Sequence, residues 1–305
     1  MATNKATSDG EVTESQIKHY AERAKGVGLI IVEHSYVTPI GKFSPNQLGI
    51  HDDKLTPGLS RLAKAVQSHK TPVAAQISHA GARTVSTVIG AQPVGPSPVF
   101  VFQETPRELS TSEIDETVEA FGQAARRAVE AGFDAVEVHG AHGFLLNQFL
   151  SPLANKRADE YGGNLEKRAL FPLRAFKRVR KEVGGDFPLL YRLGADDFRE
   201  GGLSLHDTEI FAGKLVDAGV DSIDVSSGIA GSNPKGLSGQ GYLFHLAEKI
   251  KKATRVPVIG VGGVTEAEFA DKAVKNGKVD LVAVGRALLA DPEWAVKATD
   301  TLKRS

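Results

Sequence analysis

The 305-residue chain contains no cysteine, which excludes disulfides and thiolate-ligated metal or iron–sulfur centres. Neither charge is in excess, with 37 Lys+Arg against 37 Asp+Glu, so the sequence lacks the basic character of a nucleic-acid-binding protein or a polybasic membrane anchor. No stretch approaches the roughly 20 apolar residues of a membrane span, and the polar first residues lack the apolar core of a signal peptide. These absences predict a soluble, cytoplasmic globular protein. Its expected partner is a small molecule or another protein, with no nucleic acid and no membrane.

Seven short apolar runs recur along the chain, each preceded by a glycine or proline turn and followed by a helical segment. They are 27–34, 72–79, 133–139, 187–193, 220–226, 256–262 and 279–285. Helical spacing is clearest after Ser110 and Glu113, which suit a capping box, because apolar residues then recur every three or four positions. Three joints, AGFDAVEV, AGVDSIDV and NGKVDLVAV, share a glycine and an aspartate before the run. Near-continuous apolar runs indicate strands buried on both faces, and hence a parallel sheet covered by helices.

This alternation fits two folds, a doubly wound open sheet and a (β/α)8 barrel. A length of 305 residues without a visible second domain favours the barrel, for which about 250 residues is typical. The first run is not followed by G-x-G-x-x-G, which weakens the dinucleotide-binding alternative. We therefore predict an α/β protein with a (β/α)8 TIM barrel as a single domain over residues 1–305. Because only seven runs are found, the first strand is expected to precede residue 1.

One connection, residues 80–111, is too long for a simple strand-to-helix loop and is rich in Pro, Gly, Ser and Thr. Long loops at the carboxyl ends of barrel strands usually carry function. We expect this connection to form a lid or one wall of the pocket.

Glycines follow the last two runs, in GVGGV (260–264) and VGR (284–286). Barrels commonly bind phosphate at these two loops through backbone N–H groups. Either loop alone is equally well explained by a tight turn that needs glycine. Together with Arg286, whose guanidinium can form charge-assisted hydrogen bonds, they favour a phosphorylated ligand.

His139 and His142 are spaced H-x-x-H at the end of the run 133–139. A metal pair would need further ligands, and this spacing alone is a weak signal. Two neutral or charged donors side by side could instead hold a developing oxyanion. The two histidines could also satisfy each other as structural residues of the loop, so the pattern leaves three interpretations open.

Gln76 and Arg192 end apolar strands, where neither side chain belongs in a packed core without a partner. A bound heterocycle would supply one, because glutamine both donates and accepts while arginine favours an anionic ring edge such as that of a reduced flavin. Glu137 lies two residues before His139 on the same strand face and fits a structural ion pair. We assign Glu137 no chemistry.

With these residues in view, the chain resembles the Old Yellow Enzyme family of FMN-dependent NAD(P)H:flavin oxidoreductases and ene-reductases. The most specific segment is HGAHGFLLNQFLSPLANKRADEYGG, and MATNKATSDGEVT, GLIIVEHSYV, QISHAGAR and VGRALLADPEW add to it. The resemblance implies a flavoprotein with FMN at the strand carboxyl ends and NADPH or NADH as the reductant. The reaction it implies is hydride transfer to the C=C bond of a small-molecule activated alkene, an α,β-unsaturated carbonyl or enoate compound. In the family the Met-Ala-Thr segment follows the first barrel strand, in agreement with a first strand that precedes residue 1.

The resemblance also implies residue roles by position. His139 and His142 would be the catalytic pair that binds the substrate's electron-withdrawing oxygen. The cofactor-binding residues would be Ala2, Thr3, His34, Gln76, Arg192, Gly262, Gly263, Gly285 and Arg286. Among these, Gln76 and Arg192 would meet the flavin pyrimidine, and the glycines with Arg286 would meet the phosphate. No residue is expected to bind a metal.

Two positions depart from the family's pattern. Phe144 stands where many members carry a tyrosine that protonates the substrate's α-carbon, and phenylalanine has no donor. A water or another hydroxyl, such as that of Tyr36, would have to take this role. Ala2 stands where relatives place a threonine or cysteine against the flavin, so that hydrogen bond is absent.

These departures keep two alternatives open: a catalytically impaired flavin-binding protein and, from the H-x-x-H pattern, a metal-dependent hydrolase on the same barrel. The sequence does not determine the physiological alkene or the choice between NADH and NADPH. It also leaves open whether the protein is a homo-oligomer.

Overall fold

Seven parallel strands form the centre of the computed structural model, which describes residues 1–304. Neighbouring strands follow the order β1-β2-β5-β6-β7-β8-β9. The strands are β1 (Ile30–Tyr36), β2 (Val73–Ser78), β5 (Ala135–Gly140), β6 (Leu189–Gly194), β7 (Ser222–Ser226), β8 (Val258–Val261) and β9 (Leu281–Ala283). Every strand overlaps one of the predicted runs and every neighbouring pair is parallel, which confirms the predicted parallel sheet.

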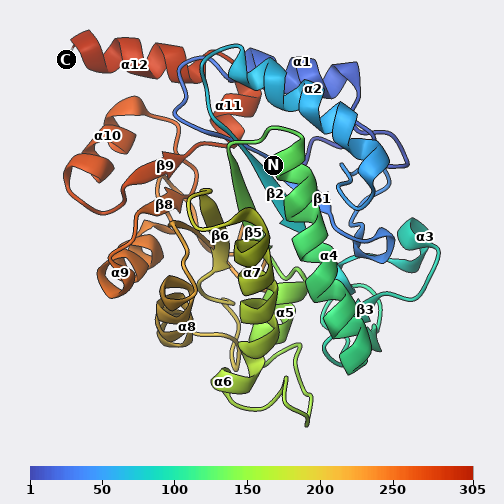
Figure 1. Cartoon of the computed structure of the whole chain (residues 1–305). Helices are drawn as coiled ribbons and strands as arrows, with labels where there is room; N and C mark the ends of the chain where they lie inside the picture. Colours follow the sequence, from blue (N-terminus) through green and yellow to red (C-terminus); the bar gives the residue numbers. More distant parts are fainter. Residues whose placement is uncertain (305) are drawn as a thin grey trace.

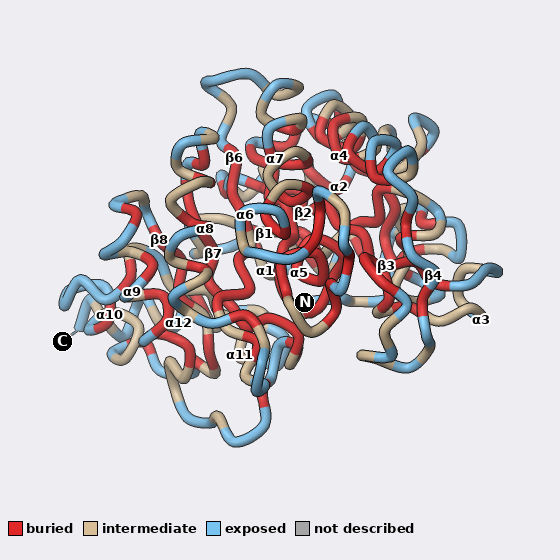
Figure 2. The backbone as a smooth tube through the Cα atoms, turned by 90° about the horizontal axis from the view of Figure 1, so that it is seen from below, coloured by how far each residue is buried: buried red, intermediate tan, exposed pale blue. Residues whose placement is uncertain are grey.

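Helices cover the outer face of the curved sheet (Figure 1). The longer ones are α1 (Glu14–Arg23), α2 (Thr56–Gln67), α4 (Thr111–Glu130), α7 (Leu170–Val183), α8 (Leu205–Asp217), α9 (Phe244–Thr254), α10 (Ala267–Lys275) and α12 (Trp294–Arg304). Shorter elements are η1 (Pro39–Gly41), η2 (Asp53–Leu55), η3 (Gly81–Arg83), α3 (Ser86–Ile89), β3 (Val94–Gly95), β4 (Arg107–Glu108), α5 (Leu145–Leu150), α6 (Leu165–Arg168) and α11 (Arg286–Ala290). Figure 2 shows the buried strands at the centre and the exposed residues on outer helices and loops.

The sheet does not close on itself in the described part of the chain. No ladder joins β1 to β9 within residues 1–304, and Leu281 of β9 is 48% exposed. The helices do meet across this opening, because Arg23 of α1 donates to the carbonyls of Leu288 and Leu289 in α11 at 3.1 and 3.3 Å. The arrangement is that of a (β/α)8 barrel lacking one strand, as the sequence predicted.

Helix α4 begins where the sequence places its capping box. The Glu113 carboxylate accepts from the Ser110 backbone N–H at 2.8 Å, and the Glu113 N–H donates to the Ser110 hydroxyl at 3.2 Å. The predicted apolar positions between 114 and 125 are buried against the sheet and its neighbours. The capping box and the apolar spacing therefore fix both the start and the orientation of this helix.

The three similar helix-to-strand connections, AGFDAVEV, AGVDSIDV and NGKVDLVAV, have the same structural role. Asp134, Asp221 and Asp280 each precede a strand, and each carboxylate accepts the first backbone N–H of a neighbouring strand at 2.8 to 2.9 Å. The backbone N–H of each aspartate also donates to the carbonyl of that same residue at 2.8 to 2.9 Å. These paired bonds satisfy backbone groups at the amino ends of the sheet and hold the register of adjacent strands.

Side chains inside the barrel change from apolar to polar along the strands. Near the amino ends, a small cluster of Ala74, Ala135, Leu190 and Ile259 fills the interior. Two residues further along β2, β5 and β6, on the same strand faces, the side chains are polar. The apolar cluster thus forms a floor, and a polar layer follows it toward the carboxyl ends.

The connection 80–111 contains η3, α3 and a small parallel sheet of β3 and β4. Gln148 of α5 attaches it to the turn after β5. Its amide donates to the carbonyls of Ala80 and Gly143 at 2.9 and 2.6 Å and accepts from the Ala82 N–H at 3.0 Å. This places the connection beside the carboxyl ends of β2 and β5, and its role as a lid or pocket wall stays a prediction.

Candidate active site

Four polar side chains form a layer inside the barrel across β2, β5, β6 and β7. The Gln76 amide donates to the Glu137 carboxylate at 2.5 Å, and Arg192 pairs with Asp224 at 2.5 Å. The strand register explains both pairs, since Gln76 lies opposite Glu137 and Arg192 lies opposite Asp224. The sequence singled out Gln76 and Arg192 as site residues. It assigned Glu137 no chemistry and missed Asp224, although both carboxylates are 0% exposed.

Several buried polar atoms of this layer have no hydrogen-bond partner within residues 1–304. They are Glu137 Oε2, Asp224 Oδ1 and Arg192 Nε, and His139 Nδ1, outside this layer, is also unpaired. An unpaired buried polar group costs about 1–3 kcal/mol, so a set of them indicates a place for a ligand. Burial raises the pKa of Glu137 to about 8, with the charge of Asp224 as the second cause. A protonated Glu137 donates to Asp224, so these two carboxyl groups satisfy each other, and Arg192 Nε and His139 Nδ1 are the atoms left for a ligand.

His34, His139 and His142 form an aromatic cluster with Phe144. The ring centroid of His139 lies 5.1 Å from that of His142, 6.0 Å from His34 and 4.7 Å from Phe144. Burial lowers the pKa of His34 to about 3 and holds the pKa values of His139 and His142 well below the usual range, with neighbouring positive charges adding to the effect. All three rings are neutral at pH 7, so each has one N–H donor. The structure brings the predicted catalytic pair together as neutral donors.

A turn with unusual backbone geometry carries His142. The φ angles of His142 and Gly143 are +58° and +71°, in the left-handed region that residues other than glycine rarely adopt. The Asn147 side chain accepts from the Gly143 N–H at 2.8 Å, and the Ser226 hydroxyl lies 2.7 Å from His142 Nε2. Strained residues that surrounding hydrogen bonds hold in place are typical of functional sites.

Gln47, which the sequence analysis did not single out, fixes the ring of His34. Its amide nitrogen donates to the His34 carbonyl at 2.9 Å and lies 2.7 Å from His34 Nδ1. Because the same nitrogen donates to a carbonyl, Nδ1 acts as the acceptor and the ring proton sits on Nε2. No local pattern could have revealed this contact, since it depends on how the loop after β1 folds back.

The predicted phosphate loops come together at the ends of β8 and β9. Gly262 and Gly263 have φ angles of +144° and +63°. A methyl group on Gly263 would lie 2.7 Å from the Gly239 carbonyl oxygen and 3.4 Å from a terminal nitrogen of Arg286. Gly285 directly precedes Arg286 at the start of α11. The structure therefore explains the glycines and brings the loop after β8 next to the predicted arginine.

The first residues of the chain lie beside the two outer strands. Thr3 donates to the Glu33 carboxylate of β1 through its backbone and its hydroxyl, at 2.6 and 2.5 Å. The sulfur of Met1 lies 2.8 Å from where a methyl group on Gly285 would sit, and Ala2 is exposed. Thr3 is thus tied to Glu33, and contact of Ala2 or Thr3 with a cofactor stays a prediction.

The structure does not support Tyr36 as the substitute proton donor. Its hydroxyl donates to the Asp9 carbonyl at 3.0 Å, and its ring stacks on His51 with centroids 4.7 Å apart. Burial raises the pKa of Tyr36 to about 12, which makes the phenol a weaker acid. The prediction was wrong because the hydroxyl is bound to the amino-terminal segment instead of meeting the His139 cluster.

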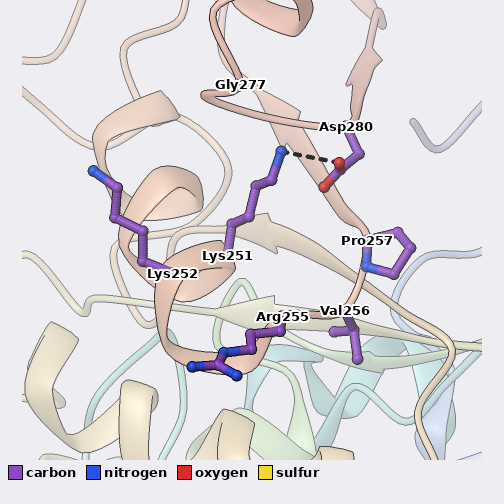
Figure 3. Close-up of a pocket in the computed structure, with 7 residues that line it drawn as sticks. All are labelled: Lys251, Lys252, Arg255, Val256, Pro257, Gly277 and Asp280. Carbon is purple, nitrogen blue, oxygen red and sulfur yellow. Dashed lines mark ion pairs between the residues drawn. The ribbon is translucent and has the colours of Figure 1, made fainter.

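A surface pocket lies at the opposite end of the strands (Figure 3). It is lined by Lys251, Lys252, Arg255, Val256, Pro257, Gly277 and Asp280. Pro257 and Asp280 precede β8 and β9, so the pocket is at their amino ends. Lys251 pairs with Asp280 at 2.9 Å, and the other oxygen of Asp280 accepts the first N–H of β8. Lys251, Lys252 and Asp280 are engaged in ion pairs or backbone bonds, so we do not assign the active site to this pocket.

Within residues 1–304, no three His, Asp or Glu side chains are grouped so that they could hold a metal ion. Over the same residues, no helix has both the length and the apolar character needed to cross a membrane.

The fold and the site define an α/β-barrel protein with a polar layer inside the barrel and two glycine loops at the strand carboxyl ends. The sequence profile of the NADH:flavin oxidoreductase / NADH oxidase family matches residues 1–305. The chain belongs to this family.

Curated relatives carry related names. An NADH oxidase of Thermoanaerobacter brockii is 46% identical over 309 residues, which cover 98% of this chain and 48% of that protein. An NADPH dehydrogenase of Clostridium acetobutylicum is 39% identical over 303 residues, covering 98% of this chain and 88% of that protein. The chain thus spans about half the length of the first relative and most of the second.

Solved structures show the same fold. A 2-naphthoyl-CoA reductase in complex with 2-naphthoyl-CoA superposes with a TM-score of 0.91 at 32% identity, covering 98% of this chain and 48% of that one. Morphinone reductase gives a TM-score of 0.86 at 28% identity, with coverage of 99% and 84%. The Old Yellow Enzyme homologue from Zymomonas mobilis gives 0.85 at 27% identity, with coverage of 98% and 86%. These matches confirm the resemblance drawn from the sequence.

Family membership makes the protein an NAD(P)H-dependent flavin oxidoreductase with FMN as its cofactor. The residues present fit FMN on structural grounds. The unpaired Arg192 Nε and the donors and acceptors beside it suit the polar edge of a pyrimidine. The glycine loop beside Arg286 suits a phosphate, because glycines let an anion approach the backbone N–H groups and Arg286 adds a positive charge next to Gly263.

Proposed function

We propose that the protein reduces the C=C bond of α,β-unsaturated carbonyl or enoate compounds. The observation that carries this proposal is the pair of neutral imidazoles of His139, which is buried, and His142, which is half-buried, with ring centroids 5.1 Å apart. Two donors on one substrate oxygen polarise the conjugated system and stabilise the negative charge that develops on that oxygen. Because both rings are neutral, the interaction strengthens as charge develops, which favours the transition state over the ground state.

FMN, when bound, supplies hydride transfer between NAD(P)H and the alkene. We assign its pyrimidine edge to Gln76 and Arg192, and we place Ala2, Thr3 and His34 beside the ring. Its phosphate is assigned to Gly262, Gly263, Gly285 and Arg286. Asp224 holds Arg192 from one side at 2.5 Å, which orients the guanidinium while Nε stays unpaired for the ligand.

A proton must also reach the α-carbon of the alkene. Phe144 has no donor, and the Tyr36 hydroxyl is bound to the Asp9 carbonyl. We therefore assign this proton to water or to another hydroxyl of the chain. The Ser226 hydroxyl, 2.7 Å from His142 Nε2, orients that imidazole and lies at the catalytic pair.

Phe144 also supports a second candidate, a catalytically impaired flavin-binding protein. General acid catalysis typically contributes 10²–10⁴-fold, so losing the donor could leave alkene reduction very slow. This candidate has the same FMN site and differs only in that the reduced protein does not transfer hydride to an alkene at a useful rate.

Absorbance spectroscopy under anaerobic conditions separates the two candidates. The FMN-loaded protein is first bleached with NADPH or NADH and then mixed with 2-cyclohexenone or an enoate. We expect the flavin bands to return with the alkene in the wild type, and to return far more slowly in a His139→Ala, His142→Ala variant. Bleaching without recovery by any activated alkene would reject ene-reduction and favour the second candidate.

A further inference from the structure

Arg83 is a cation near the candidate active site to which the proposed function gives no role. It ends η3, directly after β2, in the connection 80–111. Its guanidinium carbon lies 5.1 Å from the ring centroid of Phe102. A methyl group on Gly143 would lie 3.4 Å from one of its terminal nitrogens, and one on Gly231 would lie 2.9 Å from the other. Segments that follow β2, β5 and β7 therefore surround one guanidinium.

This guanidinium has no anionic partner in the part of the chain that the structure describes. Within residues 1–304, no carboxylate pairs with Arg83, and no side-chain hydrogen bond ties it to a carbonyl. Other inward arginines differ, because Arg157 pairs with Asp159 at 2.5 Å and Arg168 donates to a backbone carbonyl at 2.8 Å. Burial lowers the pKa of Arg83, and the positive charge of Arg199 is the next cause. The local field is positive and unbalanced.

The contacts of Arg83 leave its hydrogen-bond donors unused. The contact with Phe102 is a cation–π interaction, which forms no N–H···O hydrogen bond and so leaves the five in-plane N–H groups available. Those in-plane donors match a carboxylate in a two-point arrangement. At the terminal nitrogen beside Gly231, the absence of a side chain leaves the position 2.9 Å from that nitrogen for a ligand oxygen, whereas the space beside Gly143 is filled by the Phe102 ring.

Arg83 is also close to the catalytic pair. Gly143, which borders its guanidinium, directly follows His142 in the chain. The charge of Arg83 is one cause, after burial and Arg192, of the lowered pKa of His142. A substrate whose carbonyl is held by His142 therefore comes near the unpaired guanidinium.

We propose that Arg83 binds a carboxylate of the substrate, so that the preferred substrates are activated alkenes carrying an anionic group in addition to the oxygen held by His139 and His142. This inference rests on the proposed function, because it needs the histidine pair to hold the other end of the molecule. The carboxylate supplies the negative charge that the chain itself does not place beside Arg83. An arginine that only packs on Phe102 would not distinguish charged from neutral substrates.

The test uses the FMN-loaded protein with 4-oxopent-2-enoate and its methyl ester, two enones that differ by one charge. We expect Arg83→Gln to lower kcat/KM for the acid about 10- to 100-fold, as for loss of a charge-assisted hydrogen bond, and to change the ester less than about twofold. Arg83→Lys should restore part of the rate with the acid, since it keeps the charge without the planar fork. Arg61→Gln removes an exposed charge that pairs with Glu14 and is the control for net charge, so it should leave the acid-to-ester ratio unchanged.

Equal losses for acid and ester in Arg83→Gln, or no loss for either, would overturn the proposal. A loss confined to reduction by NADPH or NADH would also overturn it, because Arg83 would then serve the phosphates of the nicotinamide. If the wild type reduces neither compound, the proposed function fails on its own. Titration with saturated 4-oxopentanoate and its methyl ester, followed by flavin absorbance, still tests Arg83 in that case. About tenfold weaker binding of the acid alone in Arg83→Gln supports the anion site, and unchanged binding rejects it.

Discussion

The two ends of this barrel differ in whether their polar groups have hydrogen-bond partners. At the amino ends, Asp134, Asp221 and Asp280 each satisfy backbone groups of a neighbouring strand, and Lys251 pairs with Asp280. At the carboxyl ends, buried atoms of the Gln76, Glu137, Arg192 and Asp224 layer stay unpaired, and His142 has a strained backbone. Polar groups with hydrogen-bond partners stabilise the sheet, whereas unpaired ones indicate where a ligand would supply the missing partners. Substitutions at the amino ends should therefore change stability, and substitutions at the carboxyl ends should change function.

The largest effect is expected at the histidine pair. His139→Ala or His142→Ala removes one donor to the substrate oxygen, and such a loss typically lowers the rate about 10²–10³-fold. We expect this decrease in the alkene half-reaction measured by stopped-flow absorbance, with bleaching by NADPH much less affected. Equal slowing of both half-reactions would show that these residues do not act through the alkene oxygen.

A pH effect follows from Glu137. Burial raises its pKa from 4.5 to about 8, so between these values the folded protein binds a proton that the unfolded chain has lost. The contribution of Glu137 to stability is therefore present below about pH 4.5 and is lost as the pH rises toward 8, by at most about 1.4 kcal/mol per pH unit.

Glu137→Gln keeps an oxygen for the Gln76 amide and cannot ionise. We expect it to flatten the decline between pH 5 and 8 in urea unfolding of the flavin-free protein. An unchanged pH profile in this variant would show that Glu137 is already ionised in the folded state.

At the amino ends, Asp134→Ala tests the structural role of the repeated joints. It removes the acceptor of the Val73 N–H at 2.8 Å and of the Gln67 amide at 3.0 Å. We expect the free energy of unfolding to fall by about 1–2 kcal/mol, while kcat of the folded protein stays within about twofold. A large decrease in kcat without loss of stability would contradict the purely structural role of the amino ends.

The smallest effect is expected from Tyr36→Phe. It removes one hydrogen bond, to the Asp9 carbonyl, and should lower stability by about 1 kcal/mol or less. Alkene reduction should be unchanged, because the hydroxyl is bound to the Asp9 carbonyl and not to His139 or His142. A decrease of 10²-fold or more in that half-reaction would restore Tyr36 as the proton donor.

Local patterns were enough to predict the sheet and part of the site. Seven apolar runs gave seven strands, because each strand of a parallel barrel is buried along most of its length. The H-x-x-H spacing placed His139 and His142 together because both belong to one strand end and its turn. The capping box at Ser110 marked the start of α4 for the same local reason.

Contacts between distant segments could not be predicted in this way. Gln47 reaches His34 from a loop, and Asp224 reaches Arg192 from the next strand of the sheet. Strand β1 also has a register irregularity between Val32 and Ser35, and no sequence pattern indicates it. Tyr36, the last residue of this strand, bonds through its hydroxyl to the Asp9 carbonyl, a contact that the sequence did not predict.

The most direct test of the division between the two ends is FMN binding itself. Equilibrium titration of flavin-free protein with FMN, followed by flavin fluorescence, compares Arg192→Met at the carboxyl ends with Lys251→Met at the amino ends. Both variants remove one positive charge paired with an aspartate. We expect Arg192→Met to weaken FMN binding about tenfold or more, and Lys251→Met to leave it within about twofold of the wild type. Equal affinities in all three proteins would contradict the assignment of the unpaired polar layer to the flavin.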